Sequence, residues 1–414
     1  RHFDVKIKTN VDFDVKVPES AENWLKFEKP AVEFDRGIRP REVTVRFNWG
    51  INSRDIERNA VVKFRPKDEV TLARQDELSV NQNAAEPIEE DTRAGDSVAL
   101  LAIARSLNMW ESWETNEKMD NWDNVVLWEE GMDGYTPEKA GRVKFARFST
   151  FGTKEGLPFE VQYLTAADEL VFFSNTNWTT FDLSTGEYIT KLGQLRRLTI
   201  SGYGLVDLDP DFKNLKNLES LDISVNNFEK IPEVLTKENF PKLHALYLNT
   251  CQRGVIYDLS NTTTTHFGGL FEETDQTREF PRRLLEWDNL DTLTLSVNYL
   301  QGRIPDMKDY AQKYTQADIS AADSLPQALV GTPKVLPNIK RFSINLNRLT
   351  GELPEWLLHH PALDWMDPFT LVFTQEGKDQ DGKLAGFTNE PVNLDEYYRF
   401  YEGKKYLDPN KKEE

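Results

Sequence analysis

The sequence is poor in cysteine, in long apolar runs and in positive charge. Cys251 is the only cysteine among 414 residues, so no disulfide framework can form within one chain. No stretch approaches the roughly eighteen consecutive apolar residues that a membrane-spanning helix needs. Fifty lysine and arginine residues stand against 69 aspartate and glutamate residues, and the net charge of −19 repels nucleic acids and anionic lipid surfaces. We therefore expect neither a membrane span nor a nucleic-acid partner.

Catalytic signatures are also absent. The five histidines show no H-E-x-x-H spacing, and no G-x-S-x-G, P-loop or dinucleotide-binding motif occurs. His359 and His360 precede Pro361, where a helix end is expected rather than a metal site. The motif D-Q-D-G at 379–382 lacks most ligands of a calcium loop, so a polar turn is predicted. The sequence thus predicts no enzyme activity, no cofactor and no metal.

What is present indicates a folded chain of several domains. A length of 414 residues suggests two or three domains, and ten tryptophans supply large side chains for their cores. The first residue is Arg1 rather than methionine, so we expect a processed or trimmed chain whose targeting segment lay upstream. A single cysteine is compatible with export, because a large core needs no disulfides.

Residues 1–85 contain short runs rich in valine and phenylalanine, separated by asparagine, glycine, proline and aspartate. Their alternation of apolar and polar residues predicts antiparallel strands that pack as an all-β, immunoglobulin-like sandwich. The acidic segment 86–95 is predicted to be a linker. The predicted strands are 2–7, 11–17, 42–49, 59–64 and 78–82.

The order of motifs in this domain resembles one known family, the BACON domain, which is Bacteroidetes-associated and often N-terminal. FDVKIKTN is followed by Trp24-Leu25, by VTVRFNWGIN, by R-x-A-x-V at 58–62 and by VNQN at 80–83. The resemblance implies carbohydrate binding. The residues favour a spacer, because Trp24 is expected to face the core and only Trp49, before a glycine, is a candidate for an exposed ring.

A repeat of about two dozen residues is the strongest pattern in the chain. The template L-x-x-L-x-L-x-x-N-x-L is matched best from Leu218, Leu290 and Ile339. Stacked units are expected to form one parallel sheet over a shared leucine interior, an α/β leucine-rich-repeat solenoid spanning 143–366. One step of 47 residues predicts a degenerate repeat near 267–270. The units start at residues 143, 167, 195, 218, 243, 290, 314, 339 and 363.

The asparagine of the template is expected to hydrogen-bond to backbone groups at the turn of each coil. Cys251 occupies this position in its own repeat, which favours a buried structural thiol over a nucleophile. The predicted structural ladder consists of Asn175, Asn226, Cys251, Asn298 and Asn347.

Flanking segments resemble features of the plant-like subclass of leucine-rich repeats. The motif L-x-G-x-I/L-P at 300–305 and 349–354 resembles its convex side. Residues 96–142, with Asp96 as the expected helix N-cap, resemble its N-terminal cap, and residues 367–414 are predicted to close the other end. The cap's paired cysteines are absent, so a set of tryptophans is predicted to replace them: Trp110, Trp113, Trp122 and Trp128.

Ligand binding is expected on the concave face of the sheet. Side chains predicted for this face are mostly small and hydroxylic, and include Asp318 and Ser320 in the unit that begins at 314. The insertion 252–283, which departs from the repeat, is a second candidate surface, and a smooth sheet without a ligand is the remaining interpretation. The candidate ligand residues are Phe173, Tyr203, Tyr247, Asp222, Asn249 and Asn345.

The combination of a BACON-like domain with these repeats resembles cell-surface proteins of gut Bacteroidetes, which implies export and a lipid anchor in the outer membrane. We therefore predict a monomeric, non-enzymatic adhesion or binding protein that recognises a protein or peptide through its repeats. Glycan binding is the alternative. A hydrolase with a dispersed active site is the third possibility, although 69 acidic residues make any pair of carboxylates weak evidence for it.

Overall fold

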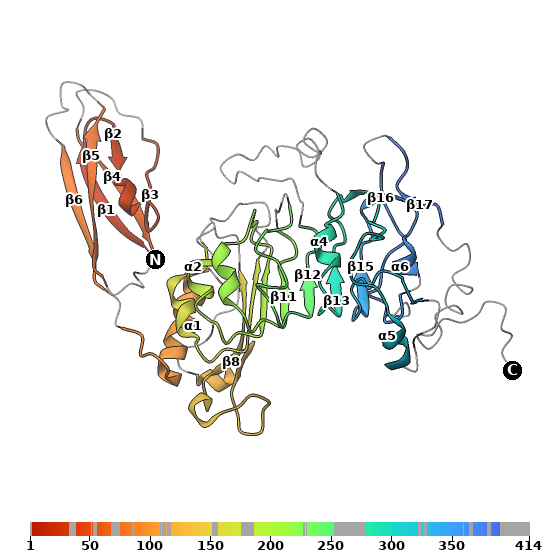
Figure 1. Cartoon of the computed structure of the whole chain (residues 1–414). Coiled ribbons are helices and arrows are strands. Elements are labelled where there is room, and N and C mark those ends of the chain that lie inside the picture. The colour runs from red at the N-terminus through yellow and green to blue at the C-terminus, as the bar shows by residue number, and fades with distance from the viewer. Residues whose placement is uncertain are drawn as a thin grey trace. The chain divides into compact units, whose positions relative to one another are not determined.

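The computed structural model divides into two compact units, Arg1–Glu90 and Asp91–Glu414 (Figure 1). The division falls inside the predicted linker, whose last residues belong to the second unit. The structure describes residues 2–32, 39–50, 52, 56–67, 75–84, 87–107, 109, 113, 117–150, 156–174, 186–226, 228, 230–251, 279–321, 325, 329–358, 360–363, 367–378 and 382–389.

The first unit contains two antiparallel three-stranded sheets. A short 3-10 helix, η1 (Glu19–Ala21), connects them. The strand β3 is absent from the sequence-based prediction because its LKFE sequence is short and mostly exposed. The first sheet has the order β1 (His2–Thr9), β4 (Arg41–Trp49), β3 (Leu25–Glu28), and the second has the order β2 (Phe13–Lys16), β5 (Arg58–Pro66), β6 (Asp76–Gln82).

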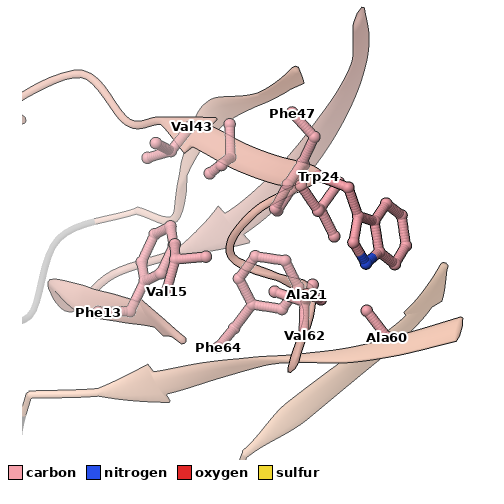
Figure 2. Close-up of a cluster of buried hydrophobic side chains, with 11 residues drawn as sticks. Phe13, Val15, Ala21, Trp24, Val43, Phe47, Ala60, Val62 and Phe64 are labelled. Carbon is pink, nitrogen blue, oxygen red and sulfur yellow. The ribbon is translucent and has the colours of Figure 1, made fainter. Parts of the chain in front are cut away.

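Side chains from both sheets fill one core (Figure 2). Alternation along each strand sends every second side chain inward, so Phe47 of β4 meets Phe64 of β5 edge to face with 6.3 Å between ring centroids. Trp24 is buried as predicted, with 6% of its surface exposed. The guanidinium group of Arg58 lies 4.5 Å from the Trp24 ring centroid and covers the indole.

An eight-stranded sheet is the main element of the second unit (Figure 1). Seven strands are parallel, and β7 (Val125–Leu127) adds an antiparallel edge strand to β8. The last four parallel strands are three residues long, whereas the first three have eight, six and five residues. The parallel strands are β8 (Val143–Thr150), β9 (Glu169–Ser174), β10 (Arg197–Ser201), β11 (Ser220–Asp222), β12 (Ala245–Tyr247), β13 (Thr292–Thr294) and β15 (Arg341–Ser343).

The first strand leucines stack in register across this sheet, which confirms the predicted parallel strands and leucine interior. Leu198 pairs with Leu170 on one side and Leu221 on the other, and the row continues through Leu246 and Leu293. All five side chains are at most 1% exposed. Burying one leucine stabilises a fold by roughly 1.5–3 kcal/mol, so this row is a major source of the unit's stability.

The repeat predicted from residue 314 is wrong. β13 pairs directly with β15, and residues Gln316–Ala321 form the helix α5 instead of a strand. The local sequence favours the helix, because the Asp318 carboxylate accepts hydrogen bonds from the backbone N–H and hydroxyl of Thr315 (2.8 and 2.9 Å). Asp318 and Ser320 therefore do not lie on the sheet.

The step of 47 residues between the repeat starts at 243 and 290 also adds no strand to the sheet. β12 pairs directly with β13, so no strand lies between them in the sheet, although 47 residues separate the two repeat starts. The degenerate repeat predicted near 267–270 lies outside the described residues. The final predicted unit, from residue 363, lies partly outside the described residues. Ile344 and Leu346 donate backbone hydrogen bonds to Leu371 and Thr374, which places 371–374 beside the residues that follow β15.

Short helices and one small sheet complete the second unit (Figure 1). The parallel strands β14 (Gln301–Gly302), β16 (Arg348–Gly351) and β17 (Gly386–Phe387) make up the small sheet, which includes the two L-x-G-x-I/L-P motifs. Gly351 has a φ of +88°, a conformation that disfavours other residues. The helices are η3 (Met119–Asn121), η4 (Pro137–Lys139), η5 (Phe159–Tyr163), α2 (Gly186–Ile189), η7 (Pro210–Asn214), α4 (Arg282–Leu285), α5 and α6 (Glu355–Leu358).

The longest helix, α1 (Arg93–Ser106), begins three residues before the predicted N-cap. Thr92 is the N-cap, and its hydroxyl accepts a hydrogen bond from the Gly95 N–H (2.9 Å). Asp96 instead faces the first coil, where it accepts two hydrogen bonds from the Arg142 guanidinium and one from the Val143 N–H, all of 2.8 Å.

Tryptophans pack near the strand β8. Trp113 stacks on Trp122 with 5.3 Å between ring centroids, and the Trp128 indole donates a hydrogen bond to the Ala166 carbonyl (2.8 Å). All three are at most 8% exposed. Trp110 lies outside the described residues.

Candidate functional site

We call the face of the large sheet opposite the leucine interior the open face, and alternate residues of each strand point to it. A row at the strand starts consists of Phe145, Glu169, Arg197, Ser220, Ala245, Thr292 and Arg341. Two further rows, named the first and second row, lie beyond it. The first row, formed by residues that pair across neighbouring strands, is Arg147, Val171, Thr199, Asp222, Tyr247, Thr294 and Ser343. The second row, two positions further along, is Ser149, Phe173, Ser201, Ser224, Asn249, Ser296 and Asn345.

Most serines and threonines of the open face are only 5–9% exposed, because larger neighbours and adjacent strands crowd them. Phe173 is the most accessible apolar side chain in these two rows, at 37%. The guanidinium group of Arg147 lies 5.8 Å from its ring centroid. The two form a cationic and aromatic surface at the β8–β9 end of the sheet.

Asp222 and Tyr247 are neighbours in the middle of the first row. The Asp222 carboxylate accepts a hydrogen bond from the Ser224 N–H (2.9 Å). Burial raises the pKa of Asp222 above its ordinary value, opposed by the hydrogen bonds from Ser224. Burial also raises the pKa of the Tyr247 hydroxyl, and the nearby charge of Asp222 adds to that effect. The centre of the open face thus holds a half-buried carboxylate beside a half-buried phenol ring.

Asn249 and Asn345 join neighbouring coils along the second row. The Asn249 side-chain oxygen accepts a hydrogen bond from the Ser296 N–H (3.0 Å), and the Asn249 N–H donates to the Ser224 hydroxyl (3.1 Å). The Ser296 hydroxyl donates to the Asn345 side-chain oxygen (2.5 Å). Both amide oxygens therefore already have partners within the chain, although both side chains remain half-buried rather than enclosed.

Tyr203 was wrongly predicted as a ligand residue. Its side chain is 0% exposed, and it occupies the coil position that an asparagine holds in other repeats. Its backbone N–H donates to the Asn226 side-chain oxygen (3.2 Å), which fixes the turn inside the unit. A large aromatic residue at this position fills the interior, so it cannot contact a ligand on the open face.

Carboxamide side chains bind backbone groups inside the unit. The Asn226 amide nitrogen donates to the carbonyls of Ile200 and Ile223 (2.8 Å each), so it bridges two coils. The Asn347 nitrogen likewise donates to Leu295 and Ile344 (2.9 and 2.8 Å). Asn175 lies outside the described residues.

Cys251 is enclosed in the same position. Its N–H donates to the Asn298 side-chain oxygen (2.7 Å), and its thiol lies 3.3 Å from the Ile223 carbonyl oxygen. Burial raises the pKa of the Cys251 thiol, so it stays protonated at neutral pH. A protonated and enclosed thiol does not serve as a nucleophile.

The sequence-based prediction missed one member of this set. The Gln375 amide nitrogen donates to the carbonyls of Ile344 and Val372 (3.0 and 2.9 Å), as the template asparagine does in earlier coils. Its side-chain oxygen accepts a hydrogen bond from the Leu349 N–H (3.3 Å). The sequence signal was the V-x-x-Q spacing, which the asparagine template does not include.

A row of basic and acidic residues at the start of the strands was also missed. These residues follow the first apolar residue of each unit, and basic and acidic side chains alternate: Lys144, Asp168, Arg196, Glu219, His244, Asp291 and Lys340. Asp168 lies 3.2 Å from the Lys144 ammonium and 3.6 Å from the Arg196 guanidinium. Arg196 also contacts Glu219 (2.9 Å), and this hydrogen bond lowers the pKa of the Glu219 carboxyl. These ion pairs link neighbouring coils, and the groups that form them have their partners within the unit.

The described residues offer neither a metal site nor a membrane-spanning helix. They contain no group of three or more histidine, cysteine, aspartate or glutamate side chains that could hold a metal ion. Within the same ranges, no helix has the length and apolar character needed to cross a bilayer. His360 is buried after α6, and its Nε2 lies 3.1 Å from the carbonyl oxygens of Val335 and Leu336. His359, the segment 379–381 and the insertion residues 252–278 lie outside the described residues.

Comparisons with known proteins give a likeness of fold only. No family model and no curated protein matches the chain. A leucine-rich-repeat protein from Bacteroides thetaiotaomicron is 14% identical, with 87% of this chain and 51% of that chain covered and a TM-score of 0.30. A leucine-rich-repeat protein from Leptospira interrogans is also 14% identical, with 52% and 41% covered and a TM-score of 0.31.

A third solved structure is the leucine-rich-repeat ectodomain of a plant membrane receptor kinase from Arabidopsis thaliana, in complex with Casparian strip integrity factor 2. It is 15% identical, with 68% of this chain and 29% of that chain covered and a TM-score of 0.37. The chain spans less than half the length of this ectodomain and of the Leptospira protein. The repeat architecture follows from the in-register pairing of the chain's own parallel strands.

Proposed function

We propose that this chain is a non-enzymatic binding protein whose open face holds a segment of another polypeptide. The observation that supports this most is the in-register first row, in which seven parallel strands present one side chain each to the same surface. Such a surface offers periodic contacts to an extended segment without using the leucine interior. The centre of the row offers Asp222 and Tyr247, and one end offers Arg147 and Phe173.

Each unit has a separate place in this proposal. The first unit, with its two facing sheets, is an immunoglobulin-like, BACON-like sandwich that acts as a spacer. In the second unit, α1 and the tryptophans near β8 form the N-terminal cap, and 367–414 close the other end. Asn226, Cys251, Asn298 and Asn347 serve as a structural ladder. The protein is an adhesion or binding protein displayed at a cell surface by a lipid anchor, and it acts as a monomer.

A peptide-display selection tests the function. Random twelve-residue peptides are selected on the whole chain, and the dissociation constants of enriched peptides are measured for wild type and for Thr199→Trp, which obstructs the first row between Val171 and Asp222. We expect Thr199→Trp to weaken binding at least tenfold, because an indole fills the space above the strands. Lys213→Trp, on exposed η7, is the matched control and should bind as wild type does.

The same variants separate the alternatives. Peptides that bind Thr199→Trp and wild type equally would contradict the use of the open face. Glycan-array binding by wild type without any enriched peptide would replace the proposal by glycan recognition. Thermal unfolding followed by circular dichroism shows whether each variant is folded before its affinity is interpreted.

A further inference from the structure

We propose that Asp222 and Tyr247 form a subsite for one cationic side chain, lysine or arginine, of the bound polypeptide. The inference rests on the proposed function of the open face and adds the chemistry of its central contact. The bound segment must therefore carry a basic residue, and acidic or neutral segments would not fill this subsite.

Asp222 differs from the acidic residues near it because no cation of the described residues forms an ion pair with it. Its neighbours Glu169 and Glu219 contact arginines at 2.7 and 2.9 Å, and Asp367 contacts Arg341 at 2.6 Å. Within the described residues, Asp222 takes part in no ion pair, and its partner is Ser224. A half-buried carboxylate without a counter-charge is costly, and a ligand cation would offset that cost.

Arg197 and Arg341, which lie on other strands of the same sheet, already form ion pairs with other carboxylates. Arg197, one strand away, makes charged hydrogen bonds with Glu169 (2.7 Å) and Asp168 (3.0 Å). Arg341 is paired with Asp367 on the last coil. Moving either arginine to Asp222 would break an existing pair, so a cation from outside the chain is the simpler partner.

Tyr247 supplies the second half of the subsite. It is the Cα partner of Asp222 on the adjacent strand β12, and the two half-buried side chains point to the same face. An aromatic ring beside a carboxylate is a favourable site for a cation, since the ring face attracts positive charge and the carboxylate accepts its hydrogen bonds. On the far side of Tyr247, the Thr294 hydroxyl is buried and has no hydrogen-bond partner among the described residues.

Charge over the whole molecule favours the same class of partner. The net charge of −19 attracts a basic segment over long range and repels an acidic one. Long-range attraction by itself would not select a position, because it acts on every basic residue of a ligand. Asp222 gives the position, since it is the one carboxylate in the described first row.

The test compares charged and neutral forms of the same peptide. Peptides enriched on the whole chain are sequenced, and each basic residue of the best binder is replaced by its neutral counterpart, arginine by citrulline or lysine by norleucine. We expect one replacement to weaken binding to wild type at least tenfold. In Asp222→Asn the charged and neutral peptides should bind within twofold of each other. Asp211→Asn, the same substitution on exposed η7, should keep the full difference.

Tyr247→Leu provides a second variant in case Asp222→Asn does not fold, and it should reduce the preference for the charged peptide severalfold. Enriched peptides that are blocked by Thr199→Trp but show no charge preference would overturn this inference and leave the proposed function in place. Peptides that do not depend on the open face would overturn both. An unchanged preference in Asp222→Asn would show that the cation binds elsewhere.

Discussion

At the scale of single residues, short polar side chains inside the second unit determine how one coil joins the next. Asn298 makes three such bonds: its oxygen accepts from the Cys251 N–H (2.7 Å), and its nitrogen donates to the carbonyls of Leu248 (2.7 Å) and Leu295 (3.0 Å). The residue is 1% exposed, so water cannot replace these bonds. Backbone groups that lose such a partner while buried keep their full desolvation cost.

Asn298→Leu is therefore expected to lower the free energy of unfolding by about 1–3 kcal/mol, because two carbonyls and one N–H lose their partner. Urea-induced unfolding followed by circular dichroism measures the change. Asn338→Leu is the control, since Asn338 is exposed and donates to the Asp288 carbonyl at the surface, and its effect should stay within about 0.5 kcal/mol. Equal midpoints for Asn298→Leu and wild type would refute the structural role of this amide.

His360 makes stability depend on pH. Burial lowers its pKa to about 4, whereas an unfolded chain has a histidine pKa of about 6.5. Below about pH 6.5 the unfolded state binds a proton that the folded state does not, so folding stability falls as the pH drops to about 4 and then levels off. The contribution lost over this range is about 3 kcal/mol.

His360→Gln should remove this pH dependence. Unfolding free energies measured between pH 4 and pH 7 should fall less steeply with acidification in the variant than in wild type. The variant can be less stable at every pH, because Gln keeps only part of the hydrogen bonding, so the slope and not the absolute value is compared. Parallel curves for the two proteins would contradict the burial of a neutral imidazole.

At the scale of elements, a buried ion pair attaches α1 to the first coil. The side chains of Asp96 and Arg142 are 1% and 6% exposed, and two parallel hydrogen bonds join them. Asp96 also accepts the Val143 N–H at the start of β8. Helix and sheet are thus connected through one carboxylate.

Arg142→Met should destabilise the second unit by about 3–5 kcal/mol, because it leaves a buried carboxylate without its cation. The double variant Arg142→Met with Asp96→Asn removes the charge as well and should recover part of the loss. Hydrogen exchange followed by mass spectrometry should show faster exchange in α1 for the single variant. Unaltered exchange there would mean that the pair does not hold the helix.

The strands and helices also show how much of the fold could be predicted from the sequence. The strands follow from the L-x-L pattern, because leucines three and five positions along a repeat must face one interior. The helix α5 was mistaken for a strand because Tyr314, Ala317 and Ile319 fit the apolar spacing, whereas the capping by Thr315 and Asp318 decides for a helix. The spacing of apolar residues indicates which residues are buried. It does not show whether local hydrogen bonds favour a helix over a strand.

The sequence predicted the positions of some candidate site residues correctly and of others wrongly. Asp222, Tyr247 and Phe173 were placed correctly on the open face, because alternation in a strand fixes which face a residue takes. Tyr203 was wrongly included among the candidate ligand residues, because it occupies the asparagine position of its repeat, which points inward. The pairing state of Asp222 could not be predicted, since it depends on which arginines lie near which acids on neighbouring coils.

At the scale of the whole molecule, the second unit combines a closed interior with one face of regularly spaced side chains. The leucine row, the carboxamides and the alternating charges at the strand starts all serve contacts between coils. Asp222, Tyr247, Phe173 and Arg147 belong to none of these three sets, and all of them lie on the open face.

Photo-crosslinking tests this account most directly. A peptide enriched on the whole chain is synthesised with benzoylphenylalanine beside its basic residue, irradiated with the protein, and the cross-linked residues are identified by mass spectrometry. We expect cross-links to residues of β9 to β12 on the open face, near Asp222 and Tyr247, and their loss in Thr199→Trp. Cross-links confined to unit 1 or to the helices behind the sheet would contradict it.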